Sequence, residues 1–120
     1  MINLNTTNSL LELFFNQYNY QPDKNIILFS DLKEPKKNYS WHQVFSSINS
    51  LTSEIKKYLK EGDRCLLISE NRPEWFISDM SIMLTKSITV PAYTTYLEKD
   101  YKFIIENCEP SIIFVSNLTK

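Results

Sequence analysis

Residues 65–69 have the sequence Cys-Leu-Leu-Ile-Ser, a short apolar run in which apolar and polar positions do not alternate. Runs of this kind are typical of strands that are covered on both faces, as in parallel sheets. Two more apolar strands are predicted at residues 87–91 and 112–115, and helical segments at 73–86 and 95–108 separate the three. This alternation predicts an α/β fold, in which a partial parallel sheet has flanking helices and right-handed crossovers.

The segment before these elements adds a helix and two short strands. Apolar residues at helical spacing predict an amphipathic helix over residues 8–20. Short strands are predicted at 26–29 and 38–39, and the polar loop 31–37 would join them as a hairpin. The lysines of this loop are interpreted as a solvated turn rather than as a phosphate site.

A longer helix is predicted to begin at Ser40. Ser40 and Gln43 match the capping box, in which each side chain accepts a hydrogen bond from the backbone of the other residue. Apolar residues recur at helical spacing as far as Leu59, and lysines fall in the last turns, where they suit the helix dipole. Gly62 is interpreted as the C-terminal stop of this helix.

Two of the later helices carry similar capping patterns. Asn71 with Glu74, and Thr95 with Glu98, each match a capping box. Glu98 and Lys102 are spaced as a favourable ion pair on the polar face of the last helix.

Composition and charge restrict the classes of function. The chain has 120 residues, of which 42% are hydrophobic and 22% charged, as in soluble globular domains. A net charge of −1 without a basic face predicts no nucleic-acid partner. No apolar stretch approaches the roughly 20 residues that span a bilayer, and no signal peptide is recognisable. We therefore expect no transmembrane segment and a cytoplasmic location.

The glycine and cysteine content excludes common ligand motifs. Phosphate-cradling loops need several glycines, and Gly62 is the only glycine of the chain. Cys65 and Cys108 do not have the spacing of metal ligands, so no metal site is predicted. They are interpreted as buried thiols, and a disulfide between them is the alternative.

Several stretches, in order, resemble one family. Residues 70–79, Glu-Asn-Arg-Pro-Glu-Trp-Phe-Ile-Ser-Asp, are similar to the Asn-Arg-Pro-Glu-Trp segment of long-chain fatty acyl-CoA synthetases. Residues 90–95, Val-Pro-Ala-Tyr-Thr-Thr, resemble their Val-Pro-x-Tyr-x-Thr segment, and residues 107–116 resemble the Asn-Cys-x-Pro and Ile-Phe-Val-Ser stretches that follow. Upstream of these segments, residues 39–41 (Tyr-Ser-Trp) and 62–64 (Gly-Asp-Arg) lie where the family pattern leads one to expect them. The likeness runs over nearly the whole chain and indicates the long-chain branch of the adenylate-forming, AMP-binding superfamily.

The chain departs from the family pattern at two positions. Ser87 stands where a glycine is common, just before a strand, and Ser81 stands where a small apolar residue is common.

The resemblance implies a large N-terminal α/β domain, of which residues 1–120 would be the incomplete N-terminal part. The implied reaction joins a fatty acid to AMP from ATP, releases pyrophosphate, and passes the acyl group to coenzyme A, with Mg²⁺ and cationic groups at the phosphates. The family's phosphate loop and other catalytic elements come after the region covered here. The resemblance thus assigns no catalytic residue to this chain, implies that the chain alone is inactive, and makes the remainder of the synthetase its partner. It also allows a peripheral membrane location for the full-length enzyme.

Candidate ligand-contacting residues follow from the predicted sheet, because ligands gather at the carboxyl ends of parallel strands. Tyr93, Thr94 and Thr95 follow one such strand and are candidates for the substrate pocket of the complete enzyme. The alternative is that Thr95 caps a helix and Tyr93 packs. Arg72 is expected to pair with a neighbouring acid or to face water, and contact with a phosphate is the alternative. Trp75 is expected to lie in the core.

Two other hypotheses stand beside the enzyme fragment. The chain could be a free-standing, non-catalytic α/β binding or interaction module, or an unrelated small α/β domain; the ordered motifs argue against the second. The three predicted strands are apolar on both faces, so we expect uncovered apolar surface and association of the isolated chain.

Overall fold

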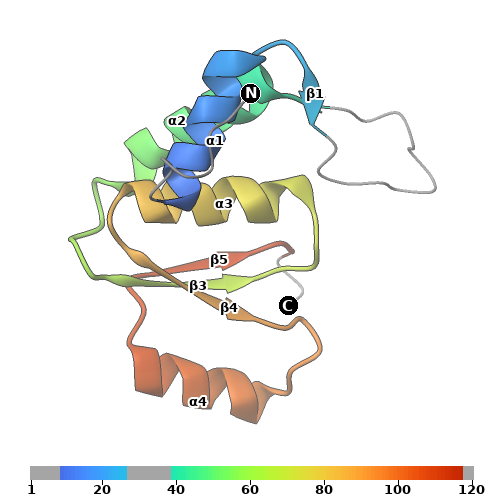
Figure 1. The fold of residues 1–120 in the computed structure, drawn as a ribbon. Coiled ribbons are helices and arrows are strands. Elements are labelled where there is room, and N and C mark those ends of the chain that lie inside the picture. Colours follow the sequence, from blue (N-terminus) through green and yellow to red (C-terminus); the bar gives the residue numbers. More distant parts are fainter. Residues whose placement is uncertain (1–8, 27–38, 118–120) are drawn as a thin grey trace.

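The computed structural model describes residues 9–26 and 39–117. The elements follow one another as α1 (Leu10–Tyr20), β1 (Asn25–Ile26), β2 (Tyr39–Ser40), α2 (Trp41–Ile55), β3 (Arg64–Ile68), α3 (Pro73–Leu84), β4 (Ile88–Ala92), α4 (Glu98–Cys108) and β5 (Ile112–Val115). Figure 1 shows that α1, α2 and α3 lie on one side of the sheet formed by β3, β4 and β5, and that α4 lies on the other side. The α/β fold predicted from the sequence is confirmed.

The main sheet has three parallel strands in the order β4-β3-β5. Leu66 of the central strand β3 is in register with Val90 of β4 and Ile113 of β5. Pro91 is accommodated because β4 is an edge strand, where the missing backbone donor costs no ladder hydrogen bond. All three strands lie within one residue of their predicted bounds.

A second, two-stranded sheet joins β1 and β2, which pair antiparallel with Asn25 opposite Ser40 and Ile26 opposite Tyr39. The antiparallel pairing agrees with the predicted hairpin. The rest of that hairpin, including the lysine-containing loop, lies outside the described residues.

Helix α2 begins as predicted but ends earlier. Its capping box is confirmed, since the Gln43 N–H donates to Ser40 Oγ at 3.1 Å and the Ser40 N–H donates to Gln43 Oε1 at 2.8 Å. The helix ends at Ile55, and the next residues form a turn in which the Lys60 N–H donates to the Asp63 carboxylate at 2.8 Å. Gly62, with a φ of 84°, lies in this later turn, so its prediction as the helix stop was wrong.

The capping boxes predicted for the next two helices were also wrong. The residue before α3 is Arg72, which makes no side-chain capping bond, and Pro73 takes the first helical position. The residue before α4 is Leu97, and its N–H donates to the Asp100 carboxylate at 3.0 Å. The ion pair of Lys102 is with Glu106, at 3.9 Å, rather than with Glu98.

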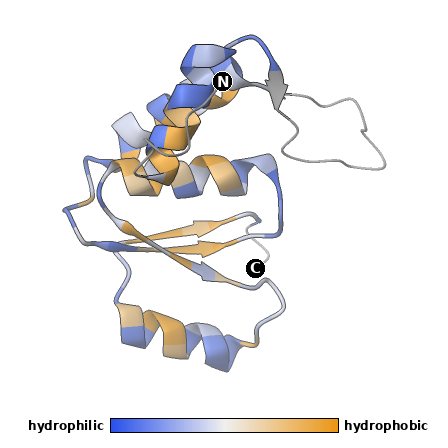
Figure 2. Ribbon diagram, viewed as in Figure 1, coloured by the Kyte–Doolittle hydropathy of each residue, from blue (hydrophilic) through white to orange (hydrophobic). Residues whose placement is uncertain are grey.

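The core consists of three apolar clusters, which Figure 2 shows as hydrophobic ribbon on the facing sides of the helices and sheet. The first lies between α1, α2 and α3 and is built on Phe14, Val44, Ile48 and Met80. The second joins Ile55, Cys65 and Ile82 from α2, β3 and α3. The third lies on the α4 side of the sheet and contains Leu66, Ile68 and Ala92, with Val90, Tyr101 and Ile104 packed against them.

The two serines that depart from the family pattern are both accommodated. Ser81 is fully buried between α2 and α3, and its hydroxyl donates to the Ile77 carbonyl at 2.7 Å. Ser87 is also buried and accepts a hydrogen bond from Thr85 Oγ1 at 3.0 Å. The left-handed residue before β4 is Lys86, with a φ of 59°, rather than Ser87.

Among the described residues, none of the helices is both long and apolar enough to cross a membrane.

Candidate functional site

The carboxyl ends of β3, β4 and β5 lie at one edge of the sheet because the three strands are parallel. The loops that leave this edge are the β3–α3 loop at residues 69–72 and the β4–α4 loop at residues 93–97. This is the edge at which ligands bind in open α/β sheets.

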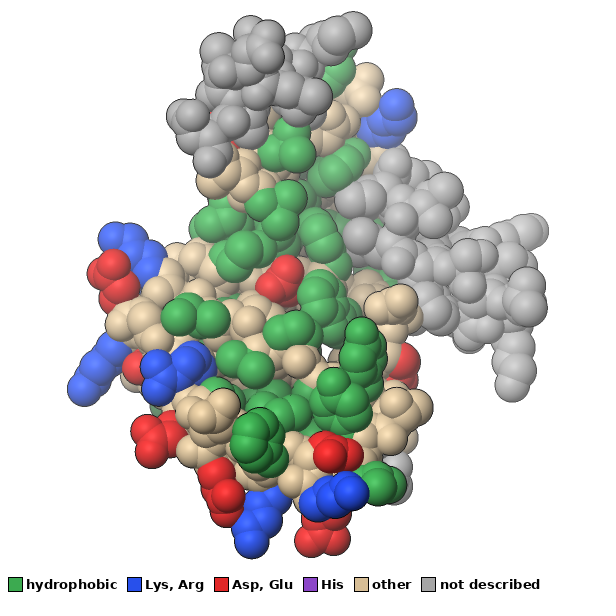
Figure 3. All heavy atoms as spheres, turned by 60° about the horizontal axis from the view of Figure 1, so that its bottom comes forward, with side chains coloured by type: hydrophobic (Ala, Val, Ile, Leu, Met, Phe, Trp, Pro, Cys, Tyr) green, Lys and Arg blue, Asp and Glu red, His purple; other side chains and the backbone are tan. Residues whose placement is uncertain are grey.

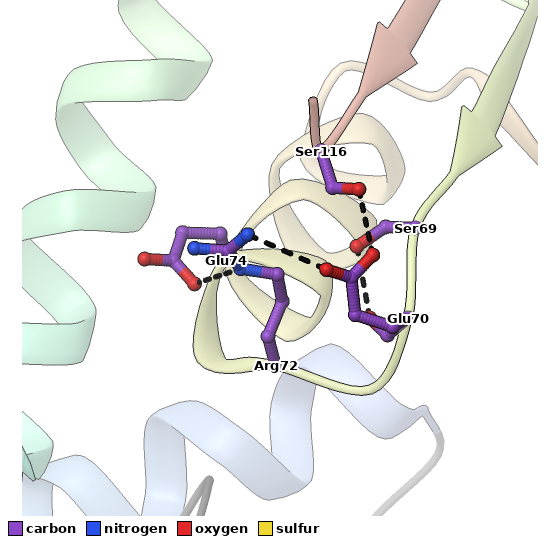
Figure 4. A network of polar contacts seen from close by, with 5 residues as sticks. All are labelled: Ser69, Glu70, Arg72, Glu74 and Ser116. Carbon is purple, nitrogen blue, oxygen red and sulfur yellow. Dashed lines mark hydrogen bonds and ion pairs between the residues drawn. The ribbon is translucent and has the colours of Figure 1, made fainter. Parts of the chain in front are cut away.

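A network of polar contacts ties the end of β5 to the β3–α3 loop (Figure 4). Arg72 Nε donates to Glu74 Oε2 at 2.9 Å, and the Arg72 guanidinium lies 3.7 Å from Glu70 Oε1. Ser116 Oγ donates to the other Glu70 oxygen at 2.7 Å. The hydrogen bond with Glu74 is the main cause that raises the pKa of Arg72. The prediction that Arg72 pairs with a neighbouring acid is confirmed, and the guanidinium is already engaged by two carboxylates.

A cavity of about 200 Å³ opens beside this network, between the start of α3 and the end of β5. Its wall includes the aromatic rings of Trp75 and Phe114, and its rim carries the hydroxyls of Ser69, Ser78 and Ser116. The cavity therefore combines an apolar wall with several hydrogen-bonding groups, as small-molecule pockets do.

A second cavity, of about 220 Å³, lies toward β4 and shares Trp75 and Ser69 with the first. Its other walls come from Asn71 of the β3–α3 loop and from Pro91, Ala92 and Tyr93 at the end of β4. The shared walls place Trp75 at the centre of the site. The prediction of Trp75 as a core residue was wrong, because its ring is only half-buried and lines both cavities.

Of the three predicted pocket residues, Tyr93 lines the second of these two cavities. Its ring is 71% exposed and packs edge-on against Tyr96 at 5.4 Å between ring centroids. The Tyr101 hydroxyl donates to the Tyr93 carbonyl at 2.5 Å, which fixes the backbone at the end of β4. Thr94 is half-buried and Thr95 exposed, and neither lines the two cavities. That these residues contact a substrate stays a prediction.

The remaining reactive side chains of the described segments do not form a catalytic group. No cluster of three or more His, Cys, Asp or Glu residues able to hold a metal ion occurs in residues 9–26 and 39–117. Cys65 and Cys108 are both free thiols; Cys65 is buried, as predicted, whereas Cys108 is only half-buried, so its predicted burial was wrong. Burial, followed by the nearby Asp63 carboxylate, raises the pKa of the Cys65 thiol to about 11, so this thiol is protonated and unreactive at neutral pH.

The same arrangement of elements occurs in solved adenylation enzymes. The N-terminal subdomain of NpsA from Klebsiella oxytoca superposes with a TM-score of 0.80 over 95% of this chain and 29% of that subdomain, at 15% identity. The anthranilate CoA ligase AuaEII, solved with anthranoyl-AMP, superposes with a TM-score of 0.78 over 88% of this chain and 20% of that protein, at 20% identity. The fold is thus that of the N-terminal region of an adenylate-forming enzyme.

The sequence profile of the AMP-binding enzyme family matches residues 14–120, and the chain belongs to that family. A long-chain-fatty-acid–CoA ligase of Gallus gallus, ACSBG2, is 28% identical over 71% of this chain. Fatty acyl-CoA synthetase A of Dictyostelium discoideum is 29% identical over 79% of this chain. The chain spans only 12% and 15% of the lengths of these two relatives.

Proposed function

We propose that this chain is the N-terminal part of the AMP-binding domain of a fatty acid–CoA ligase of the long-chain class. The observation that carries the proposal is the family match over residues 14–120, together with relatives named as fatty acid–CoA ligases. In the proposed reaction the fatty acid carboxylate attacks the α-phosphorus of ATP, giving acyl-AMP and pyrophosphate. The thiol of coenzyme A then takes the acyl group and releases AMP.

The donor set of residues 9–26 and 39–117 does not fit a complete site for ATP and Mg²⁺. The described residues hold no carboxylate cluster suited to a metal ion, and the chain has a single glycine with which to cradle phosphate. Arg72, the cation at the carboxyl edge, is paired with Glu74 and Glu70. We therefore assign the phosphate chemistry, and the binding of ATP, Mg²⁺ and coenzyme A, to the remainder of the enzyme.

In the complete enzyme, this chain is suited to provide the apolar wall of a substrate pocket. Trp75 and Tyr93 line one cavity at the carboxyl edge, and Phe114 lines the neighbouring one. These walls would contact the acyl chain or the adenine ring without taking part in bond making. Thr94 and Thr95 would then shape the adjoining loop rather than the wall itself.

Two observations bear on the substrate class. NpsA and AuaEII were solved with 3-hydroxyanthranilyl-AMSN and anthranoyl-AMP, but in these structures their identity to this chain is only 16% and 20%, and their likeness concerns the fold alone. The two curated relatives at 28% and 29% identity are both named for fatty acids. We therefore propose a fatty acid, rather than an aryl acid, as the substrate.

The test uses the natural reading frame that contains residues 1–120, expressed as one polypeptide. We expect formation of acyl-CoA that requires ATP, Mg²⁺, coenzyme A and hexadecanoate, with little product from benzoate or anthranilate. A preference for aryl acids would overturn the assignment to fatty acids. A reading frame that stops after Lys120 would favour the non-catalytic module instead.

A matched pair of substitutions tests the proposed pocket wall. In that polypeptide Tyr93→Ala is expected to raise KM for hexadecanoate or ATP several-fold and to leave the thermal midpoint nearly unchanged, because the ring is exposed. Tyr58→Ala is the control, since Tyr58 is 66% exposed and lies in the turn after α2, away from the carboxyl edge. Equal kinetic effects of the two substitutions would remove Tyr93 from the site.

A further inference from the structure

The β3–α3 loop contributes walls to both cavities at the carboxyl edge of the sheet. Ser69 lines both cavities, Asn71 lines the second and Arg72 lines the first. Residues 69–72 belong to neither a helix nor a strand, and Glu70 and Asn71 are exposed. The course of this loop, and with it the shape of both cavities, therefore depends on side-chain contacts.

Glu70 lies at the centre of the network that Figure 4 shows. One oxygen of its carboxylate accepts a hydrogen bond from Ser116 Oγ at 2.7 Å, and the other lies 3.7 Å from the Arg72 guanidinium. The Ser69 hydroxyl donates to the Glu70 carbonyl oxygen at 2.8 Å. Glu70 thus joins the loop both to the end of β5 and to the residue that precedes α3.

The backbone connection between β3 and β5 ends just before this loop. The Ser116 N–H donates to the Ile68 carbonyl at 3.1 Å, and Ile68 is the last residue of β3. The side chain of Glu70 continues the connection two residues further along the chain. Arg72 has a second partner in α3, because its Nε donates to Glu74 at 2.9 Å. The contact between Glu70 and Ser116 therefore carries the connection from the loop to β5.

The exposure of this network indicates that its effect is local. The side chains of Arg72 and Glu70 are 36% and 47% exposed, and ion pairs this exposed add little to stability because water and salt screen them. The pair of Lys102 and Glu106 on α4, at 3.9 Å, is of the same exposed kind. Figure 3, in which the α4 side is turned forward, shows acidic and basic side chains mostly around the margin of that face. Lys102 and Glu106 lie four residues apart, whereas Glu70 and Ser116 lie 46 residues apart and join two strand ends.

We propose that Glu70 is a positioning residue of the ligase, which holds the β3–α3 loop against the end of β5 and so fixes the walls of the substrate pocket; this proposal rests on the proposed function. A hydroxyl that donates to an ionised carboxylate makes one of the stronger hydrogen bonds in proteins, which suits the contact with Ser116 to this role. A displacement of about 1 Å in groups that position a substrate is enough to lower the rate strongly. Walls that bind substrate and transition state alike affect KM rather than kcat, so the loss of Glu70 should appear in KM.

The test compares substitutions of Glu70 in the polypeptide encoded by the natural reading frame that contains residues 1–120. Glu70→Ala removes both carboxylate contacts and is expected to raise KM for hexadecanoate or ATP about tenfold, with kcat within about twofold of the wild type. Glu70→Gln keeps the length of the side chain and its ability to hydrogen-bond to Ser116 and Arg72, so KM should stay within about threefold of the wild type. Glu70→Asp keeps the charge but is shorter by one methylene, and should resemble Glu70→Ala. It also gives a second reading should Glu70→Ala impair folding.

Glu54→Ala is the matched control. Glu54 pairs with Lys57 at 2.7 Å, its side chain is 59% exposed, and it lies in the last turn of α2, before the amino end of β3. KM and kcat of this variant should equal those of the wild type. Ser116→Ala should raise KM in the wild type and add little to Glu70→Ala, because both substitutions remove the same hydrogen bond.

Four kinetic outcomes overturn the proposal. They are an unchanged KM for both substrates in Glu70→Ala, a fall in kcat at unchanged KM, a loss in Glu70→Gln as large as in Glu70→Ala, and full additivity of Glu70→Ala with Ser116→Ala.

A second readout needs no activity and separates this proposal from the proposed function. The polypeptide is labelled with 5-fluorotryptophan, and the fluorine resonances of Trp75 and Trp41 are identified by their absence in Trp75→Phe and Trp41→Phe. Glu70→Ala is expected to shift or broaden the resonance of Trp75, which follows the loop and lines both cavities, and to leave that of Trp41, which packs against the cluster of Phe14. Glu70→Gln should leave both in place.

An unchanged Trp75 resonance in Glu70→Ala overturns the positioning role whatever the activity. A shifted Trp75 resonance in a polypeptide that forms no acyl-CoA contradicts only the proposed function.

Discussion

The two faces of the parallel sheet carry the same kinds of residue but differ in how far those residues are exposed. Ile112 and Ile113 are neighbours in β5, yet Ile112 packs under α2 and α3 while Ile113 is 44% exposed on the α4 side. The difference arises from which helix lies above each row and not from the side chains themselves. The comparison teaches that the exposure of a strand residue in this sheet depends on the helices above its face, since β5 is covered on the side of α2 and α3 and open on the side of α4.

The largest expected effect comes from truncating two residues of the same row. Leu66→Ala removes a fully buried side chain and should lower the free energy of unfolding by about 2–5 kcal/mol. Ile113→Ala, in register beside it, should cost less than about 1 kcal/mol in the 120-residue chain, since the side chain is already exposed. Urea unfolding followed by circular dichroism measures both. Similar losses would show that α4 covers β5 after all.

The contact between α2 and α3 gives the next largest effect. Ser81 is 0% exposed beneath α2, so Ser81→Leu should destabilise by about 1–3 kcal/mol through overpacking. Ser81→Ala is the matched control and should be close to neutral, because the Ile77 carbonyl keeps its place in the helix when the hydroxyl is lost. If the leucine variant melts at the wild-type temperature, the covered side is packed less tightly than described.

The buried thiol of Cys65 makes the covered side sensitive to alkaline pH. Burial raises its pKa from 9.0 to about 11, so between these values the unfolded chain loses a proton that the folded chain keeps. The contribution of this thiol is thus complete below pH 9 and is lost as the pH rises toward 11. We expect the free energy of unfolding to fall more steeply in this window for the wild type than for Cys65→Ala, in which the remaining groups titrate as before. Parallel curves for the two proteins would contradict the burial of Cys65.

The smallest expected effect is a gain of stability at the turn that leads into β4. Lys86 is exposed and takes a φ of 59°, a left-handed conformation that a side chain disfavours. Lys86→Gly should therefore raise the free energy of unfolding by about 0.5–1 kcal/mol, whereas Ser87→Gly should not. Thermal melts of the two variants check this, and a loss of stability in Lys86→Gly would contradict the assigned backbone conformation.

The sheet could be predicted from the sequence because its strands are continuous apolar runs between helices. The capping box of α2 could be predicted as well, since Ser40 and Gln43 are each other's partners. The pattern failed at Asn71 and Thr95 because matching residue types also occur in loops, and the Asp100 carboxylate took the capping role at α4. Capping is decided by where the helix starts, which the residue types alone do not specify.

The candidate site was predicted only in part. Parallel strands placed Tyr93 at the carboxyl edge, and the structure puts its side chain on a cavity wall. Trp75 was missed because helical spacing marks it as an apolar residue but does not show that its side chain lines two cavities at the carboxyl edge of the sheet. The available signal was its position at the start of the helix that follows β3, since β3 ends at Ile68 and Trp75 lies in the first turn of α3.

The most direct test of the account is ATP–pyrophosphate exchange measured in parallel on the 120-residue chain and on the polypeptide of the natural reading frame, with hexadecanoate as the acid. We predict exchange well above background for the longer polypeptide and none for the 120-residue chain, because in the proposed function this chain supplies pocket walls and not the groups that handle phosphate. Exchange above background by the purified 120-residue chain would contradict that division of roles.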